Sequence, residues 1–332
     1  MKISTGELEE LTIRAVRNFG YTEHEVRIIS EVLLYAQLRG NNQGVAKLIG
    51  KGIPKDQGAG EIVIEKETPI SVRINGNRNH AMVVVRKALD MVTEKAGTSG
   101  FAIAGTFNTN TSSGAIGYFA SEMAKQGLIG FVFGRSPERV AMYGSYEPVF
   151  GTNPLAVGIP AEPDPIVLDM STAAISFYGL VEADTAGAEI PGDAAYDTEG
   201  RPTTSPREAI RGAIRSFDRG HKGSGLALLG EILAGPLVGA AFCGLGDSKG
   251  NWGHLLYAID PGILGDRDEF TANVSRMIRK IKSTRKLPGV TDIFVPGERG
   301  AMLARDRLAR GELEIEENLL AGLRAAAAGA GR

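Results

Sequence analysis

The chain has 332 residues, of which 43% are hydrophobic and 23% charged, and its formal net charge is -2 at pH 7. This balance is typical of a globular protein with a large core and argues against a surface dedicated to nucleic acid or to a membrane. The single cysteine, Cys243, excludes an intrachain disulfide and a thiolate metal cluster. The N-terminal segment lacks the apolar core of a signal peptide, so we expect a cytoplasmic protein that acts on small molecules.

Two amphipathic helices are predicted at the N-terminus. Capping signals at Ser4–Glu7 and Thr22–Glu25 open them, and apolar residues recur at helical spacing as far as Gly20 and Gly40. The three amides that follow, Asn41 to Gln43, are poor helix formers and good hydrogen-bonding groups.

Strands and helices then alternate through the middle of the chain. The pattern predicts a hairpin or meander over 61–74, a helix over 80–95, a strand over 101–105, a helix ending near 126 and a buried strand over 128–133. The turn before the second of these helices, Asn108–Gly114, is rich in Asn, Thr and Ser and has no G-x-G-x-x-G spacing. A Rossmann fold is therefore disfavoured.

Residues 150–179 combine turn residues with apolar strands more densely than any other stretch. Two adjacent buried strands are predicted at 155–159 and 166–168, with Thr152 before the first and Asp169 after the second. An acid and hydroxyl groups at strand ends suggest a ligand site. Alternatively, Asp169 caps a turn and the neighbouring hydroxyls satisfy local backbone groups.

A long polar loop is predicted over 182–205, followed by the glycine-rich segment Arg219–Gly225 at the start of an apolar helix over 226–237. Cations at a helix start suit an anion such as a phosphate, because free backbone N–H groups point there. The alternative is that the glycines only allow close packing of the helix.

The rest of the chain predicts a strand over 254–259, a helix over 270–281, a short strand over 293–295, two terminal helices and a frayed tail over 325–332. The four histidines are scattered, which predicts no metal site, and there is no G-x-S-x-G elbow.

Seven segments, LRGNNQGVAKL, NTNTSSGAIGYFA, EPVFGTNPLAVGIP, IVLDMSTA, RGHKGSGLALLGEILAG, GHLLYAID and VPGER, together resemble the malate/L-lactate dehydrogenase family of the non-Rossmann type. The resemblance covers nearly the whole chain. It implies an α/β (α+β) fold with a largely antiparallel sheet, surrounding helices, and N- and C-terminal helical segments packed together. Residues 1–75 with 286–332 would form a helical unit on the substrate and dimer side, and residues 76–285 a cofactor-binding unit.

The resemblance further implies NAD(P)-dependent reduction of 2-oxo acids or cyclic imine carboxylates by a homodimer. NADPH is slightly favoured over NADH, because Arg135, Arg139 and Lys222 are available for a 2′-phosphate. The residues carried over as cofactor-binding are Leu168, Asp169, Met170, Ser171, Thr172, Ala173, Ala174, His221, Lys222, Gly297, Glu298 and Arg299.

The resemblance places Arg39 and Lys47 near the substrate carboxylate and Thr152 facing the substrate. Where the family has Ser-His-Gly, with the His as proton donor, this chain has Asn42, Gln43 and Gly44. The family's second His, in an Asn-His-Phe-Gly turn, is replaced within the segment TSSG at 111–114.

An amide does not titrate near neutral pH, so Gln43 can orient a substrate but cannot act as a general acid. An imine that enters already protonated needs no protein donor, which favours an imine substrate oriented by Asn42 and Gln43. One alternative is a 2-oxo-acid reductase with another donor, such as Asp169 or a water held by Asn110. The other is a catalytically silent cofactor-binding homodimer.

Overall fold

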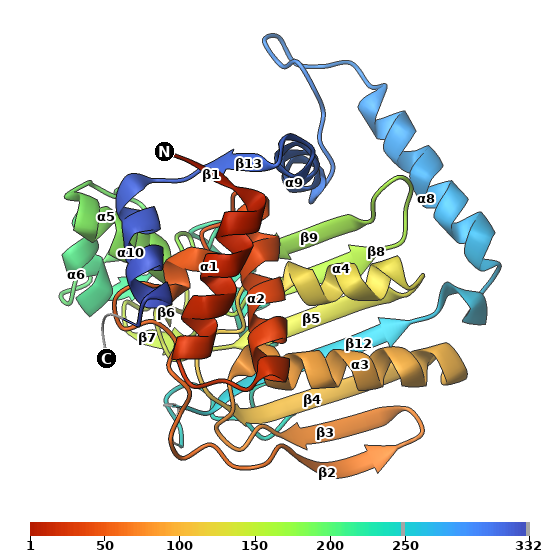
Figure 1. Ribbon diagram of the computed structural model, residues 1–332, viewed down its shortest axis with the longest axis horizontal. Coiled ribbons are helices and arrows are strands. Elements are labelled where there is room, and N and C mark those ends of the chain that lie inside the picture. Colours follow the sequence, from red (N-terminus) through yellow and green to blue (C-terminus); the bar gives the residue numbers. More distant parts are fainter. Residues whose placement is uncertain (247–249, 330–332) are drawn as a thin grey trace.

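The centre of the protein is a seven-stranded sheet with the strand order β2-β3-β4-β12-β5-β8-β9. In the computed structural model, which describes residues 1–246 and 250–329, β3 and β4 are parallel and the other neighbours are antiparallel. This confirms the predicted non-Rossmann, largely antiparallel α/β (α+β) fold (Figure 1). The strands are β2 (Val63–Thr68), β3 (Ser71–Asn75), β4 (Phe101–Thr109), β12 (Trp252–Ile259), β5 (Ile129–Arg135), β8 (Leu155–Ile159) and β9 (Ile166–Met170).

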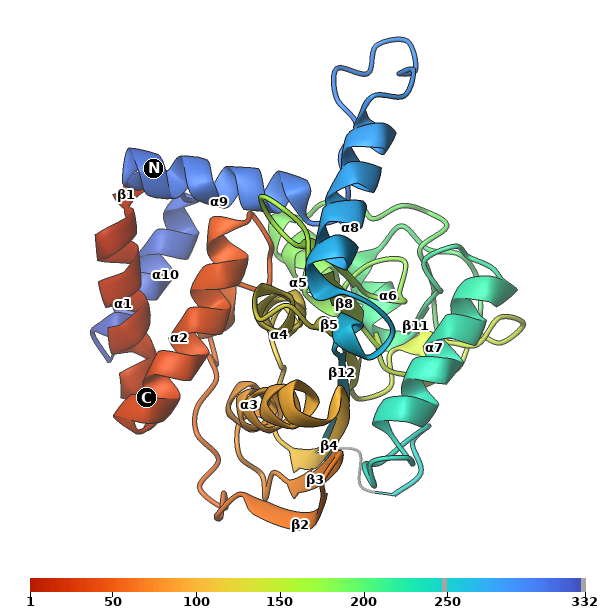
Figure 2. The same ribbon diagram turned by 90° about the vertical axis from the view of Figure 1, so that its right-hand side faces the viewer.

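Helices cover both faces of this sheet (Figure 2). On one face lie α3 (Ala81–Ser99) and α4 (Gly117–Lys125), and α7 (His221–Ala234) packs against β5 and β12 on the other. The outer helix α2 (Glu23–Leu38) packs on α3, so α3 lies between α2 and the sheet. Its three consecutive valines, Val83 to Val85, are therefore all buried. The predicted capping box of α2 is confirmed at Thr22 and Glu25.

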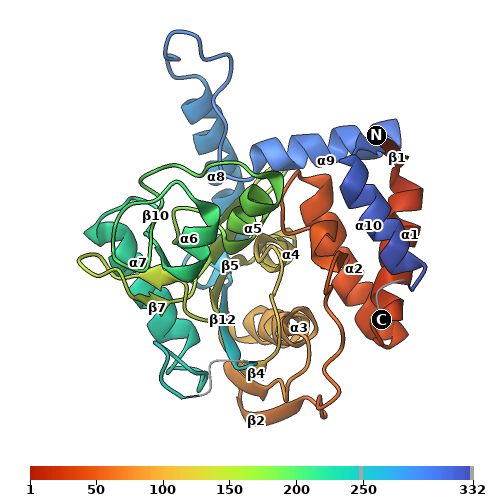
Figure 3. The same cartoon turned by 90° about the vertical axis from the view of Figure 1, so that its left-hand side faces the viewer.

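The two ends of the chain pack together, as predicted (Figure 3). Strand β1 (Lys2–Ser4) pairs with β13 (Glu312–Glu314), α1 (Thr5–Asn18) packs on α10 (Glu317–Ala327), and α2 contacts α9 (Glu298–Arg310). The two strands were not predicted, because a three-residue strand has too few positions to show an alternation. The division at residue 75 stays a prediction, although β2 and β3 pair with the central sheet.

A smaller sheet with the order β10-β11-β6-β7 lies beside the central one. It comprises β10 (Ala195–Tyr196), β11 (Ala213–Ile214), β6 (Val140–Ala141) and β7 (Pro148–Phe150), and α5 (Phe177–Ala186) and α6 (Pro206–Arg211) accompany it. The predicted polar loop over 182–205 is therefore wrong at its start, where α5 continues to Ala186. Helix α5 has no polar face to reveal it, and only Ser176 at its start and the left-handed Gly187 at its end mark it.

Three further predictions need correction. Helix α7 begins at His221, five residues before Leu226, because the glycines of its first turn are helical. Residues 293–295 form no strand, since the adjoining segment meets the edge strand β9 through the single bond from Val167 N to Pro296 O at 3.1 Å. Strand β9 itself is half-exposed rather than buried, because it is that edge.

The predicted frayed tail is also partly wrong. Helix α10 continues to Ala327, whose side chain is buried, while residues 330–332 lie outside the described part of the chain. Helix α8 (Arg267–Lys282) extends away from the body (Figure 2), and two short 3₁₀ helices, η1 (Val45–Leu48) and η2 (Pro261–Ile263), complete the fold. Within residues 1–246 and 250–329, no helix is long and apolar enough to cross a membrane.

Candidate active site

A cavity of about 450 Å³ opens where segments distant in the sequence meet. Its walls come from the amides Asn41 to Gln43, the loop between β4 and α4, the end of β5, the turn before β8, the end of β9 and the start of α5. The polar segments at 41–43, 152 and 169–171 therefore meet at one cavity, together with 111–114, for which no site role was predicted.

The amides Asn42 and Gln43 stand in the wall of this cavity. Asn42 Nδ2 donates to Ser176 Oγ at 3.4 Å, and Gln43 Nε2 donates to Asn42 Oδ1 at 3.1 Å. Behind them Gly44 has no room for a side chain, because a Cβ there would lie 2.5 Å from Gln37 Oε1. The amides are thus held by one another, and no histidine lines the cavity among the described residues.

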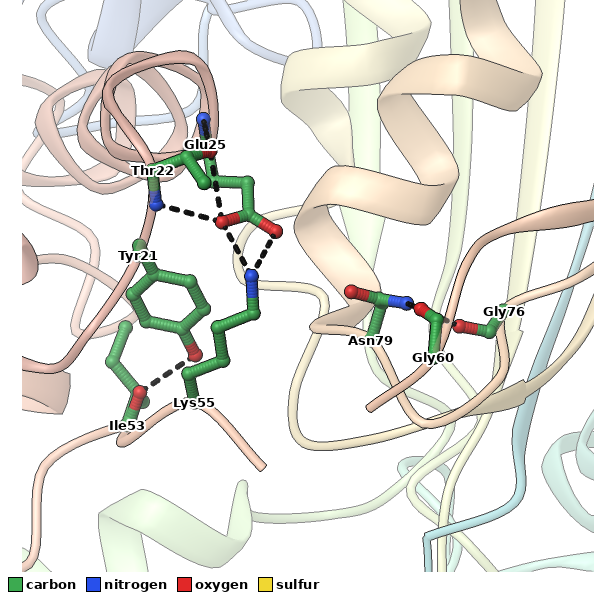
Figure 4. Close-up of polar contacts among 8 residues, drawn as sticks. All are labelled: Tyr21, Thr22, Glu25, Ile53, Lys55, Gly60, Gly76 and Asn79. Carbon is green, nitrogen blue, oxygen red and sulfur yellow. Dashed lines mark hydrogen bonds and ion pairs between the residues drawn. The ribbon is translucent and has the colours of Figure 1, made fainter. Parts of the chain in front are cut away.

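The segment between η1 and β2 closes one side of the cavity with Ile53. Tyr21 Oη donates to the Ile53 carbonyl at 2.7 Å, and Lys55 Nζ contacts both carboxylate oxygens of Glu25 at 2.8 Å (Figure 4). Further along, Asn79 Nδ2 donates to two backbone carbonyls at 2.6 and 3.0 Å. These bonds fix a loop that has little regular structure of its own.

Lys47 lies directly behind the cavity wall and is only 2% exposed. Its Nζ donates to Ser112 Oγ at 3.0 Å and sits 4.0 Å from the centroid of the Tyr178 ring. Burial lowers the pKa of the Lys47 amine to about 7. Ser112 and Tyr178 both line the cavity, whereas Lys47 reaches it only through them.

Thr152 is held in the wall by its own backbone. Its carbonyl accepts bonds at 3.0 Å from Ser171 Oγ, Thr172 N and Thr172 Oγ1. The preceding Gly151 is required, because a Cβ there would lie 2.4 Å from the Ser136 carbonyl oxygen. The turn before β8 and the end of β9 are therefore tied together at the site.

Arg135, at the end of β5, is fully buried and lines the cavity. Its Nε donates to Glu231 Oε1 at 3.1 Å, and its Nη2 pairs with Glu138. Glu231 also accepts from Asn153 Nδ2 at 2.7 Å and from Cys243 N at 2.8 Å. Within the described chain, Arg135 Nη1 is buried without a partner.

Asp169 stands between this cavity and a second one of about 220 Å³, and it lines both. Its Oδ2 accepts from Gly117 N at 2.8 Å at the start of α4. Asp169 is an exposed residue, and its open surface lies toward the two cavities. The protein around the carboxyl group still displaces bulk water, and this desolvation raises the pKa of the Asp169 carboxyl group to about 6, although the Gly117 amide partly counteracts it. Arg39, stacked 3.7 Å from the Tyr35 ring centroid, lines the second cavity.

The predicted site residues fall into groups. Asn42, Gln43, Thr152, Asp169, Met170 and Ser171 line the first cavity; Arg39, Asp169 and Gly297 line the second. The residues that line neither cavity are Lys47, Asn110, Leu168, Thr172, Ala173, Ala174, His221, Lys222, Glu298 and Arg299. Their assigned roles stay predictions.

Asn110 and the glycine-rich start of α7 have partners within the protein. Asn110 Nδ2 donates to Asp56 Oδ2 at 2.9 Å. The backbone amides of Gly220 and Gly223, predicted to be free for an anion, both donate to the Asp218 carboxylate at 2.9 Å. The Asp218 carboxylate thus already accepts the bonds from these backbone amides at the start of α7. A phosphate bound nearby would have to be held by charged side chains.

Sequence reasoning missed Ser112, Tyr178 and Phe177 as cavity residues. Ser112 had a signal, since it lies in the Asn-, Thr- and Ser-rich turn, but nothing in the sequence connects that turn with Lys47. Tyr178 depends on α5, which was not predicted. In the part of the chain that the structure describes, no group of three or more His, Cys, Asp or Glu could hold a metal ion.

The model of the family described as malate/L-lactate dehydrogenase matches residues 3–324. The L-sulfolactate dehydrogenase of Methanothermobacter thermautotrophicus is 35% identical over 96% of this chain and 94% of its own. The malate/(S)-sulfolactate dehydrogenase of Methanothermus fervidus is 36% identical over 98% of this chain and 96% of its own. The solved structure of Δ1-piperideine-2-carboxylate reductase from Pseudomonas syringae matches with a TM-score of 0.85, at 27% identity, over 98% of this chain and 99% of that one.

Proposed function

The chain belongs to the malate/L-lactate dehydrogenase family and is an oxidoreductase, and from that premise we propose that it transfers hydride between NAD(P)H and C2 of a small substrate that carries a carboxylate. The observation that carries this proposal is the first cavity. Its walls combine the cation Arg139 with hydroxyl and amide groups and with the carboxyl group of Asp169, while Arg135 is fully buried and paired with Glu231 and Glu138. Such walls suit an anionic substrate and a phosphate-bearing cofactor.

The residues present fit a dinucleotide. Two cavities adjoin at Asn41 and Asp169. Two residues of the first cavity, Arg135 and Thr111, carry buried polar atoms, Nη1 and Oγ1, that have no hydrogen-bond partner among the described residues. Met170 and Ser171 would hold the cofactor in the first cavity. When bound, the reduced nicotinamide supplies a hydride to the substrate. NADPH is our first choice over NADH, because several cations surround these cavities.

Lys222→Ala is expected to raise the dissociation constant for NADPH by about tenfold, as the loss of one charge-assisted contact predicts. Lys222 stands exposed at the start of α7, where it can reach a phosphate. Fluorescence titration of NADPH measures the change. Lys280→Ala, at an exposed position of α8, is the matched control and should bind as the parent does. An unchanged constant in Lys222→Ala would remove Lys222 from the cofactor site.

A cyclic imine carboxylate is the first proposed substrate class. Asn42 and Gln43 line the first cavity and replace the family's Ser and proton-donating His, and neither amide titrates. A substrate that arrives as an iminium ion already carries the proton that a ketone must receive from the protein. The Pseudomonas syringae relative is named for an imine of this kind. The second class, 2-oxo acids, is favoured by the amine of Lys47 behind the wall and by the relatives named for sulfolactate.

NAD(P)H oxidation is expected with Δ1-piperideine-2-carboxylate and Δ1-pyrroline-2-carboxylate, and more slowly with pyruvate, oxaloacetate and 3-sulfopyruvate. Faster turnover of the keto acids would reverse the order of the two classes. If the imine class is correct, Gln43→His should gain keto-acid activity, since it restores a titrating side chain in the wall. A protein that NADPH stabilises against heat but that turns over no substrate in this panel would be the catalytically silent binder.

The assembly proposed for this protein is a homodimer. Helix α7 leaves apolar side chains open, with Leu228 38%, Leu229 55% and Ile232 45% exposed, and Leu237 just after the helix is 58% exposed. Such a group of apolar side chains on a helix at the surface is typical of a subunit contact. Sedimentation at micromolar concentration tests this assembly.

A further inference from the structure

The hydroxyl group of Ser112, a cavity residue, has its two acceptor positions occupied, and only its O–H donor is left. Its Oγ accepts from Lys47 Nζ at 3.0 Å and from Gly114 N at 3.2 Å. A serine oxygen has two acceptor lone pairs and one O–H donor. Both lone pairs are taken, so the hydroxyl hydrogen is left for an acceptor outside these bonds. Because Ser112 lines the cavity, a molecule bound there can supply that acceptor.

Lys47 is a buried amine that lies behind Ser112, as seen from the cavity. Only 2% of the Lys47 surface is exposed. Among the described residues, Lys47 forms no ion pair with a carboxylate. The groups that face it are the Tyr178 ring from α5 and His80 at the start of α3, whose pKa is lowered by burial and by the Lys47 charge. On its other side η1 joins the apolar core through Val45 and Leu48.

Resting on the proposed function, we propose that Lys47 and Ser112 form a proton relay that protonates the substrate heteroatom as C2 is reduced. Ser112 is the group in contact with substrate, and Lys47 acts through it. The relay takes over the task that Asn42 and Gln43 cannot perform, and it serves a ketone or an imine that binds in its neutral form.

The step balances as a two-electron reduction of the substrate by reduced nicotinamide. C2 accepts the hydride, and the π electrons of the C=O or C=N bond move to the heteroatom. The heteroatom takes the hydroxyl proton of Ser112, while Ser112 Oγ takes a proton from the Lys47 ammonium group. Lys47 is left as a neutral amine and regains a proton from water after the product leaves. An amine with a pKa of about 7 can exchange this proton at neutral pH.

Two substitutions at position 47 separate a relay from a carboxylate anchor. With a 2-oxo acid or a neutral imine as substrate, Lys47→Gln should lower kcat by roughly 10²- to 10⁴-fold, with KM changed by less than about threefold. Lys47→Arg keeps the positive charge but does not release a proton, so it should not restore kcat. Ser112→Ala should lower kcat by on the order of 10-fold to 10²-fold, because a water molecule can enter the vacated space. Lys51→Arg, at an exposed lysine of the next turn, is the control.

A substrate-independent measurement is the titration of Lys47 in the protein without cofactor. With ¹³Cε-labelled lysine, one NMR signal should titrate near pH 7 and be absent from Lys47→Gln. In the parent enzyme, kcat for reduction should fall as pH rises through this value, since the protonated amine is the donor, and Lys47→Gln should lack that fall. A neutral side chain relieves the burial of a charge, so this variant is expected to fold.

Three results would overturn the relay: a Lys47 signal that titrates near pH 10, full kcat in Lys47→Arg, or a loss in Lys47→Gln confined to KM. The last two would make Lys47 a carboxylate anchor. A parent enzyme that reduces none of the panel substrates contradicts the proposed function instead, whereas an active enzyme whose Lys47 variants keep kcat contradicts the relay alone.

Discussion

Replacing Glu231 by alanine is expected to lower the free energy of unfolding by about 3–5 kcal/mol, because it leaves a buried guanidinium without its full set of partners. Glu231 is 1% exposed and Arg135 is fully buried. The Glu231 carboxylate accepts bonds from Arg135, Asn153 and Cys243. Removing the acceptor strands several donors at once, and Glu138 alone cannot satisfy them.

Denaturant unfolding of Glu231→Ala measures this loss, and a surface ion pair of the same protein supplies the control. Glu199 pairs with Arg201 at 2.9 Å, and the two side chains are 59% and 70% exposed. Glu199→Ala should therefore change stability by at most about 1 kcal/mol. If both variants lowered the free energy of unfolding by the same small amount, the buried network around Glu231 would not stabilise the fold as its geometry indicates.

A double variant tests the cause of the loss. Glu231→Leu combined with Arg135→Met removes the charge together with its partner, so it should recover part of the stability lost in Glu231→Ala. It should not recover substrate or cofactor binding. Arg135 lines the cavity, and Asn153, which Glu231 holds, follows the cavity residue Thr152.

Lowering the pH from 7 to 5 is expected to cost about 4 kcal/mol of stability through two buried histidines, at about 1.4 kcal/mol per pH unit for each below its unfolded pKa. His80 and His254 are 4% and 0% exposed, and each has a buried Nε2 without a partner among the described residues. Burial lowers the pKa of both side chains to about 3, and at His80 the Lys47 charge adds to the effect.

The sign follows from proton binding. Between pH 6.5 and about 3 the unfolded chain protonates these histidines and the folded protein does not, so stability falls as the pH falls. Asp169 acts in the opposite direction, because its pKa of about 6 lets the folded protein bind a proton before the unfolded chain does. Two histidines outweigh one carboxyl group, and the net change on acidification is a loss.

Urea unfolding between pH 5 and pH 8 tests this account through the slope of stability against pH. His254→Gln removes one titrating group and should reduce the slope below about pH 6.5 by about 1.4 kcal/mol per pH unit, whatever its effect at pH 8. His24→Gln, at an exposed position of α2, should leave the slope unchanged. A parent protein whose stability does not vary over this range would show that the histidines are protonated in the fold.

Much of the framework could be predicted because its signals are local. The cap residues Thr22 and Glu25 lie three positions apart, and the structure joins them by their own hydrogen bonds. The hairpin of β2 and β3 and the start of α3 likewise depend on neighbours in the chain. The family resemblance extended these local signals to a non-Rossmann sheet and to packed termini, both of which the structure confirms.

The sequence by itself therefore determined the capped helices, the strands of the central sheet and the polar segments whose residues could line a site. Only the tertiary structure decided which of them meet. Lys47 and Ser112 are 65 positions apart and Arg135 and Glu231 are 96, so no local pattern connects either pair. Burial decided their chemistry as well, because an amine or an imidazole changes its pKa only when the surrounding fold removes water from it.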